Sequence, residues 1–367
     1  MRSFFFPMEG YGMVTISLCM IVKNEEDVLA RCLDSIKHAV DEIIIVDTGS
    51  TDSTKEIAYK YTDKVYDFEW IQDFSAARNE AFSKATCDYQ MWLDADDVLP
   101  ENSVRQLLEL KETLDPAVDI VTMKYHTHFD EHGNPILIST RERLIKREKG
   151  YVWQDPVHEC IPLIGNVLYS DIEVHHKKIK YEAGSTRNLD IYRKLEKSGK
   201  SFTPRQLYYY ARELKDHGIW ADAASYFEKF LATKKGWVED NIATCYNLSA
   251  CYRSLGDQQK ILPILLKSFA YDAPRAEICC EIGYYYKRMN NYAVALKWFQ
   301  IAANLSPTNS AGFILQDYWG YIPNIESCVC ACHLGDYASA KIFNERAAIF
   351  KPDAAAIEIN RNFLSLH

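Results

Sequence analysis

The chain has 367 residues, of which 48% are hydrophobic, so it is long enough for two or three domains with sizeable cores. Its net charge of −9 argues against a nonspecific nucleic-acid binder. Eleven cysteines without CxxC spacing predict reduced thiols in a cytoplasmic protein rather than a disulfide framework.

The N-terminal end predicts a short leader followed by a first strand and helix. Residues 1–13 are too short and too weakly basic for a signal peptide, and we expect a disordered leader. Residues 14–22 are apolar and predict a buried strand, and residues 24–38 predict an amphipathic helix with Asn24 as its N-cap. We find no apolar run long enough to cross a membrane.

The next segment continues the alternation of strands and helices. Residues 42–47 predict a second apolar strand ending at Asp47, followed by a helix over 55–61 and a strand over 64–69. Apolar strands separated by helices predict a parallel sheet covered on both faces. The sequence DTGS beginning at Asp47 also matches the aspartic-protease signature, but that chemistry needs two such aspartates and we find one copy.

An acidic cluster follows the next strand. Residues 74–82 predict a helix carrying Arg78, which is either a solvated charge or a nucleotide contact, and residues 89–93 predict a buried strand. This strand ends in three carboxylates: Asp94, Asp96 and Asp97. Because like charges repel, a divalent cation such as Mg²⁺ or Mn²⁺ is the obvious counter-charge. The carboxyl ends of strands are also where open α/β sheets bind ligands.

Two other interpretations of this cluster stay open. One is a solvated acidic turn after a strand. The other is the Asp-x-Asp-x-Val motif of haloacid-dehalogenase-type phosphatases, in which Asp94 would be a nucleophile. That motif normally follows the first strand of its domain, whereas here it follows about ninety residues of βα units.

The region after the acidic cluster predicts a helix over 100–114 and strands over 119–125, 137–145 and 171–176. If the last strand persists, His175 and His176 point to opposite faces, so at most one serves a given site. Between these strands, residues 151–160 contain a Trp, a His and two acids. This density favours a site, and the alternative is a polar loop with a buried Trp.

From about residue 188 the pattern becomes helical, with weak repeats. Each repeat has an aromatic-rich helix, a turn residue and a second helix. The turn residues are Gly218, Gly256, Asn290 and Gly335. This region resembles a short tetratricopeptide array of about four hairpins, which implies a surface for protein or peptide partners or for a homodimer.

Four motifs of the first half occur in a fixed order. They are Ser17 to Glu26, Val46-Asp47-Thr48-Gly49-Ser50-Thr51-Asp52, Ala77-Arg78-Asn79 and Leu93-Asp94-Ala95-Asp96-Asp97. Together they resemble family 2 glycosyltransferases of the GT-A fold, over about residues 14 to 190. The fold we expect is an α/β GT-A domain with a Rossmann-like mixed sheet over 14–187, then an all-α helical-repeat domain over 188–367.

The resemblance assigns roles to individual residues. For the nucleotide, it implies contacts from Asn24, Glu25, Asp47 and Arg78. For the metal, it implies Asp96 as a ligand of an ion that bridges the two phosphates, Asp94 near the ribose or sugar, and His176 as a late histidine ligand. For the general base, it favours Glu159 with His158 beside it, and Asp155 is the fallback. Lys178, Lys180 and Arg187 either close over the diphosphate or are surface charge.

The function implied is that of an inverting, metal-dependent glycosyltransferase of hexosyltransferase type, similar to bacterial enzymes. It would use Mn²⁺ or Mg²⁺ and a nucleotide-diphosphate sugar, with a UDP-sugar as the first choice of donor. The acceptor would be a peptide, protein or glycan, through O-, S- or N-linkage. The alternative hypotheses are a non-catalytic repeat scaffold with a degenerate nucleotide-sugar-binding domain, and the phosphatase.

Overall fold

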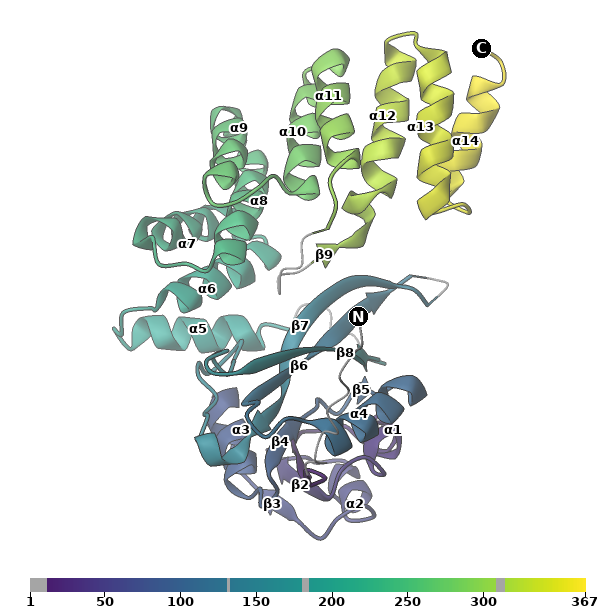
Figure 1. The fold of residues 1–367 in the computed structure, drawn as a ribbon. Helices are drawn as coiled ribbons and strands as arrows, with labels where there is room; N and C mark the ends of the chain where they lie inside the picture. The colour runs from purple at the N-terminus through teal and green to yellow at the C-terminus, as the bar shows by residue number, and fades with distance from the viewer. Residues whose placement is uncertain (1–11, 131–132, 180–184, 308–313) are drawn as a thin grey trace, which may run out of the picture. The chain divides into compact units, whose positions relative to one another are not determined.

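The computed structural model describes residues 12–130, 133–179, 185–307 and 314–367 (Figure 1). The chain divides into two compact units, Met1–Ile191 and Tyr192–His367. Most of the expected leader lies outside the described residues, as does Lys180. The division falls four residues after the boundary that the sequence suggested, inside helix α5 (Arg187–Lys197).

The N-terminal unit is built on one mixed sheet with the strand order β3-β2-β1-β4-β7-β6-β8-β5. The strands are β1 (Ile16–Val22), β2 (Glu42–Asp47), β3 (Val65–Asp67), β4 (Tyr89–Trp92), β5 (Asp97–Val98), β6 (Ile120–Phe129), β7 (Pro135–Lys146) and β8 (Val167–His176). β1 pairs in parallel with β2 and β4, and β2 with β3, as the sequence predicted. β7 runs antiparallel to β4 and β6, so the sheet is mixed.

Helices cover both faces of the parallel part of the sheet, which confirms the expected α/β architecture (Figure 1). The helices are α1 (Leu29–Ile36), α2 (Thr54–Ala58), α3 (Phe74–Ser83) and α4 (Glu101–Thr113), with a 3₁₀ turn, η1 (Arg147–Lys149), after β7. Side chains of α1, α2 and α4 share a core with Leu18 and Met20 of β1. On the other face, Ala81 and Phe82 of α3 pack with Cys19, Ile44 and Trp92.

The expected N-cap was wrong, and long-range contacts decide the local conformation both there and at Asp97. Asn24 is not an N-cap: α1 begins at Leu29 after Val28. Asn24 has a φ of 55°, and its side chain accepts a hydrogen bond from the backbone N–H of Thr51 (2.8 Å). Asp97, which the alternative interpretation placed in a solvated turn, is buried in β5 and pairs with β8.

The second unit consists of helical hairpins, as predicted. The helices are α6 (Pro204–Asp216), α7 (Trp220–Thr233), α8 (Val238–Ser254), α9 (Gln258–Lys267), α10 (Ala276–Arg288), α11 (Tyr292–Ala303), α12 (Tyr321–His333), α13 (Tyr337–Phe350) and α14 (Ala355–Leu364). Short segments η2 (Ser268–Ala270), β9 (Ile314–Leu315) and η3 (Gln316–Trp319) lie between them. Each of four hairpins has one residue with a positive φ angle in the turn between its two helices. These residues are Gly218, Gly256, Asn290 and Gly335, so the predicted turn positions are confirmed.

Among the described residues, the longest apolar stretches of helix fall short of what a membrane crossing requires.

Candidate active site

The site lies where β1, β2 and β4 end, and its first wall is made by two loops. The Asp47 carboxylate at the end of β2 accepts hydrogen bonds from the backbone of Gly49 (3.1 Å) and Ser50 (2.9 Å). The loop after β1 is bound to the loop after β2, because Ser50 Oγ accepts from Asn24 N (3.0 Å) and Thr54 Oγ1 accepts from Glu25 N (2.7 Å). Asp47 and Asn24 therefore fix the shape of this wall.

Arg78 of α3 connects the two acidic segments of the site. Its Nη2 donates to Asp94 Oδ1 and its Nε donates to Glu159 Oε1, both at 2.7 Å. The guanidinium is buried and lies against the rings of Trp92 (4.7 Å) and Trp153 (4.9 Å). Burial raises the pKa of Asp94, but the positive charge of Arg78 outweighs it and the pKa falls below its usual value. Arg78 therefore holds Asp94 ionised and Glu159 beside it.

Asp96 lies on the other side of the motif, next to His176 of β8. The Nδ1 atom of His176 is 3.1 Å from Asp96 Oδ1 and 3.3 Å from Asp97 Oδ1. Burial lowers the pKa of His176, but the hydrogen bonds with these two carboxylates outweigh it and raise the pKa to about 10. His175 points away from this cluster, since consecutive strand residues face opposite sides. The acidic motif thus stabilises the protonated, positively charged form of the His176 imidazole.

Asp97 has a structural role, because its side chain is fully buried and saturated with hydrogen bonds. Arg143 of β7 donates to Asp97 Oδ2 (3.0 Å), the hydroxyl of Tyr125 of β6 donates to Oδ1 (2.9 Å), and Asp94 N donates to Oδ2 (3.0 Å). The Arg143 guanidinium stacks on the ring of Trp92 at 3.7 Å. Asp97 therefore anchors the turn that presents Asp94 and Asp96.

The residues present fit a Mg²⁺ or Mn²⁺ ion. Ligand atoms of Asp96, Asp97 and His176 lie within 4.8 Å of one another. Since Asp97 is occupied by Arg143 and Tyr125, the remaining donors are the oxygens of Asp94 and Asp96. The imidazole of His176 would join them once a bound cation had displaced its proton. Oxygen donors with one imidazole suit Mn²⁺, and carboxylate oxygens suit Mg²⁺.

The segment after β7 carries the candidate bases on a constrained loop. Asp155 and His158 have φ angles of 70° and 54°, which non-glycine residues adopt infrequently. Asn79 of α3 holds the start of this loop, since it donates to Trp153 O (3.1 Å) and accepts from Trp153 N (2.8 Å). Such backbone conformations persist where the surroundings impose them, and they cluster at functional sites.

Glu25 and Arg187 lie at the margins of the site. Partial burial, followed by repulsion from Asp96 and Asp94, raises the pKa of Glu25 to about 7, so Glu25 shares the electrostatic environment of the motif. Arg187 is exposed at the start of α5, and its guanidinium lies 4.8 Å from the ring centre of Phe74. The structure thus groups Asp94, Asp96, His176, Arg78 and Glu159, with Arg187 apart.

Sequence reasoning missed Tyr125 and Arg143, which donate hydrogen bonds to the buried carboxylate of Asp97. Tyr125 looked like an ordinary aromatic strand residue. Arg143 did carry a signal, because it stands just before Leu144 and Ile145 in an apolar strand, where a charge is expected to have a buried partner. The sequence alone does not identify Asp97 as that partner.

Comparison with known proteins agrees with this geometry. Residues 17–165 match the family model described as Glycosyl transferase family 2. A TPR repeat-containing protein of Synechococcus elongatus is 38% identical over 154 residues, which are 41% of this chain and 36% of that protein. The SPbeta prophage-derived glycosyltransferase SunS of Bacillus subtilis is 25% identical over 234 residues (60% and 54%). The lipopolysaccharide core biosynthesis glycosyltransferase LpsC of Rhizobium meliloti is 32% identical over 161 residues (41% and 58%).

The chain spans between about a third and three fifths of the length of these relatives. Among solved structures, glucosyl-3-phosphoglycerate synthase from Mycobacterium tuberculosis has a TM-score of 0.37 and 17% identity, covering 52% of this chain and 82% of that one. The fold and site define an α/β domain with an acidic cluster at the carboxyl end of β4, followed by helical repeats. Over residues 17–165 this domain is similar in sequence to glycosyl transferase family 2.

Proposed function

We propose that this protein is an inverting, divalent-cation-dependent glycosyltransferase that uses a nucleotide-diphosphate sugar, with a UDP-sugar as the first choice. The observation that carries the proposal is the cluster of Asp96, Asp97 and His176 beside Asp94 at the carboxyl end of β4, within the segment that matches the family 2 model. The proposal includes the cytoplasmic location and the self-association through helical repeats that the sequence suggested.

The donor would lie across the carboxyl ends of β1, β2 and β4. Asp47, held by the Gly49 and Ser50 amides, would face the base or ribose, and the Asn24–Glu25 loop would form the adjoining wall. Asp96, Asp94 and His176 would hold Mn²⁺ or Mg²⁺. When bound, such an ion neutralises the charge of a departing nucleoside diphosphate.

The second requirement of the reaction is a base that takes the proton of the acceptor. Glu159 is our candidate, because Arg78 fixes one of its carboxylate oxygens 2.7 Å from the guanidinium and so orients the other. The same guanidinium binds Asp94, which ties the base to the donor side of the site. Asp155 and His158, on the constrained loop before Glu159, are the alternatives.

The acceptor is proposed to be a polypeptide or a glycan. Helical-repeat arrays typically bind proteins or peptides along their surface, which favours a polypeptide. The relatives include a lipopolysaccharide core biosynthesis glycosyltransferase, so a glycan is the second proposed acceptor.

Calorimetric titration with UDP-, GDP- and TDP-sugars, each with Mn²⁺ and then with EDTA, tests the proposal. We expect one donor to bind only with the cation. Asp96→Asn should abolish that binding, because it removes a charged oxygen ligand without changing the size of the side chain. The matched control is Asp34→Asn, whose side chain is 55% exposed on α1 and bonded to Lys37.

Two outcomes would contradict the proposal. If the folded protein binds no donor with or without Mn²⁺, the scaffold hypothesis replaces it. If Asp94 becomes phosphorylated by a phosphate ester, the phosphatase hypothesis does. Equal donor affinity for the Asp96→Asn and Asp34→Asn variants would remove Asp96 from the site.

A further inference from the structure

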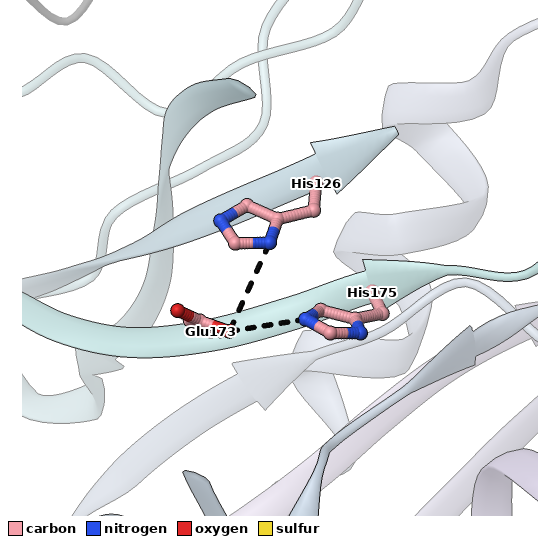
Figure 2. Close-up of side chains that lie close together, drawn as sticks. All are labelled: His126, Glu173 and His175. Carbon is pink, nitrogen blue, oxygen red and sulfur yellow. Dashed lines mark hydrogen bonds and ion pairs between the residues drawn. The ribbon is translucent and has the colours of Figure 1, made fainter. Parts of the chain in front are cut away.

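A second cluster of metal-ligating side chains lies on the opposite face of the strand pair that carries His176. In the parallel pairing of β6 and β8, His126 is the direct partner of His175. Glu173 precedes His175 by two residues and so faces the same side. Figure 2 shows the three side chains converging from the two strands. None of them belongs to the donor site described above.

The distances within this cluster suit a single small cation. Glu173 Oε2 is 3.1 Å from His175 Nε2 and 3.8 Å from His126 Nδ1, and the ligand atoms of all three lie within 4.8 Å of one another. Two ligands bound to Zn²⁺ at about 2.1 Å with tetrahedral geometry are roughly 3.4 Å apart. The cluster is therefore close to the spacing that an ion requires. The two imidazole rings are stacked at 5.0 Å with 23° between their planes, and binding would turn them about their side-chain bonds so that a nitrogen of each points at the ion.

His126 supplies an independent indication of a ligand. Its side chain is only 5% exposed, and within the described part of the chain neither ring nitrogen has a hydrogen-bond partner. A buried imidazole without partners is costly, because water can no longer satisfy its donor and acceptor. An ion bound at Nδ1 would satisfy the nitrogen that faces Glu173.

The surroundings leave this negative charge available to an ion. Lys124, on the same face of β6, is already paired with Asp171 at 2.7 Å. The ring of Phe129 lies 5.2 Å from that of His175, and the Lys177 ammonium is engaged by this ring, 3.7 Å from its centre. Glu173 retains the histidines as its close partners among the described contacts.

We propose that His126, Glu173 and His175 bind a first-row transition-metal dication of the Zn²⁺ class, separately from the donor site. Two imidazoles and one carboxylate are the ligand set of many three-ligand zinc sites, in which a fourth position stays open. The donor site, by contrast, is dominated by carboxylate oxygens. A bound ion would fasten β6 to β8 next to His176.

Zinc titration of the metal-free full-length protein, in competition with a chromogenic chelator, tests this site. The test variants are Glu173→Gln and His175→Gln, whose side chains are partly exposed, and the control is Asp34→Asn, which removes a carboxylate that is 55% exposed on α1 and outside the cluster. We expect one Zn²⁺ per chain, and affinity about 10-fold or more weaker in each test variant. The control should match the wild type.

The Asp96→Asn variant separates this site from the donor site. We expect it to keep the zinc affinity of the wild type while losing donor binding. Unchanged zinc affinity in both Glu173→Gln and His175→Gln would overturn the inference, provided circular dichroism shows folded protein. Loss of the zinc in Asp96→Asn would also overturn it, since the ion would then lie at the donor site.

Discussion

At the scale of single residues, the site depends on charges that are paired away from water. Arg78 balances two carboxylates, and Arg143 balances Asp97. The sequence predicted Asp94, Asp96 and Arg78 as site residues, because acidic strand ends and nearby cations have recognisable chemistry. It did not predict that Arg78 joins Asp94 to Glu159, since that contact spans 81 residues between Arg78 and Glu159 and depends on the fold.

Replacing Arg78 should destabilise the protein and impair donor binding. Arg78→Met would leave Asp94 and Glu159 without their counter-charge. Breaking a buried ion pair from one side costs about 3–5 kcal/mol, and we expect the lower end because the side chain of Asp94 is 35% exposed. Urea unfolding measures this loss. Arg105→Met, on the exposed side of α4, is the control, and equal stability of both variants would refute the prediction.

Glu42 should make stability depend on pH in the acidic range. Burial disfavours its charge, but hydrogen bonds from Lys64, Ser17 and Thr86 outweigh burial and lower the pKa to about 2. Because the folded pKa lies below the unfolded one, the stabilisation is complete above about pH 4.5 and is lost as the pH falls toward 2.

The measurement compares urea unfolding of the wild type and Glu42→Gln from pH 7 to pH 3. The wild type should be more stable at pH 7 by at most about 3 kcal/mol, at about 1.4 kcal/mol per pKa unit. The difference should shrink on acidification. A difference that stays constant down to pH 3 would show that ionisation of Glu42 does not stabilise the fold.

At the scale of elements, periodicity located nearly every helix and strand of the first unit, because apolar strands and amphipathic helices leave distinct patterns. Periodicity did not locate the elements whose position depends on pairing with residues far away in the sequence. β5 is two residues long and exists through its pairing with β8. The start of α1 was misplaced because Asn24 bonds to the loop after β2 instead of capping the helix.

Gly283 in α10 should resist replacement although alanine is the better helix former. A Cβ at this position would lie 2.8 Å from the ring of Phe299 in α11. Overpacking costs about 1–3 kcal/mol, more than the roughly 1 kcal/mol that alanine gains over glycine in a helix. Gly283→Ala should therefore lower stability in thermal unfolding.

A second substitution tests the cause. Phe299→Leu gives the new methyl group room. Gly283→Ala should therefore lower the stability less in the Phe299→Leu variant than in the wild type. Strictly additive effects would mean that contact between the two helices at this point is not the origin of the loss.

At the scale of the whole molecule, two compact units have separate cores. The four turns of the helical unit were predicted correctly, since tight turns at positive φ favour Gly and Asn. The sequence could not specify the helix contacts, because aromatic side chains such as Tyr208 and Phe230 meet across different helices. The boundary near residue 188 stays a prediction.

Ligands of the site should stabilise one unit alone. A donor at about 100 times its Kd adds roughly 2.7 kcal/mol to the free energy of unfolding of the unit that contains the site. We therefore expect two unfolding transitions in scanning calorimetry. The donor with Mn²⁺ should raise the temperature of one transition and leave that of the other unchanged. Asp96→Asn should abolish the shift. Movement of both transitions together would indicate that the units unfold as one.

Two consecutive histidines on β8 point to opposite faces of the sheet, so the two clusters that they serve both depend on the same strand register. His176 faces the acidic motif and His175 faces His126. Removing one residue earlier in the strand would turn each imidazole to the other side, and both clusters would lose their partner at once. Substitutions can alter either face independently, but a change of strand length by an odd number of residues must damage both together.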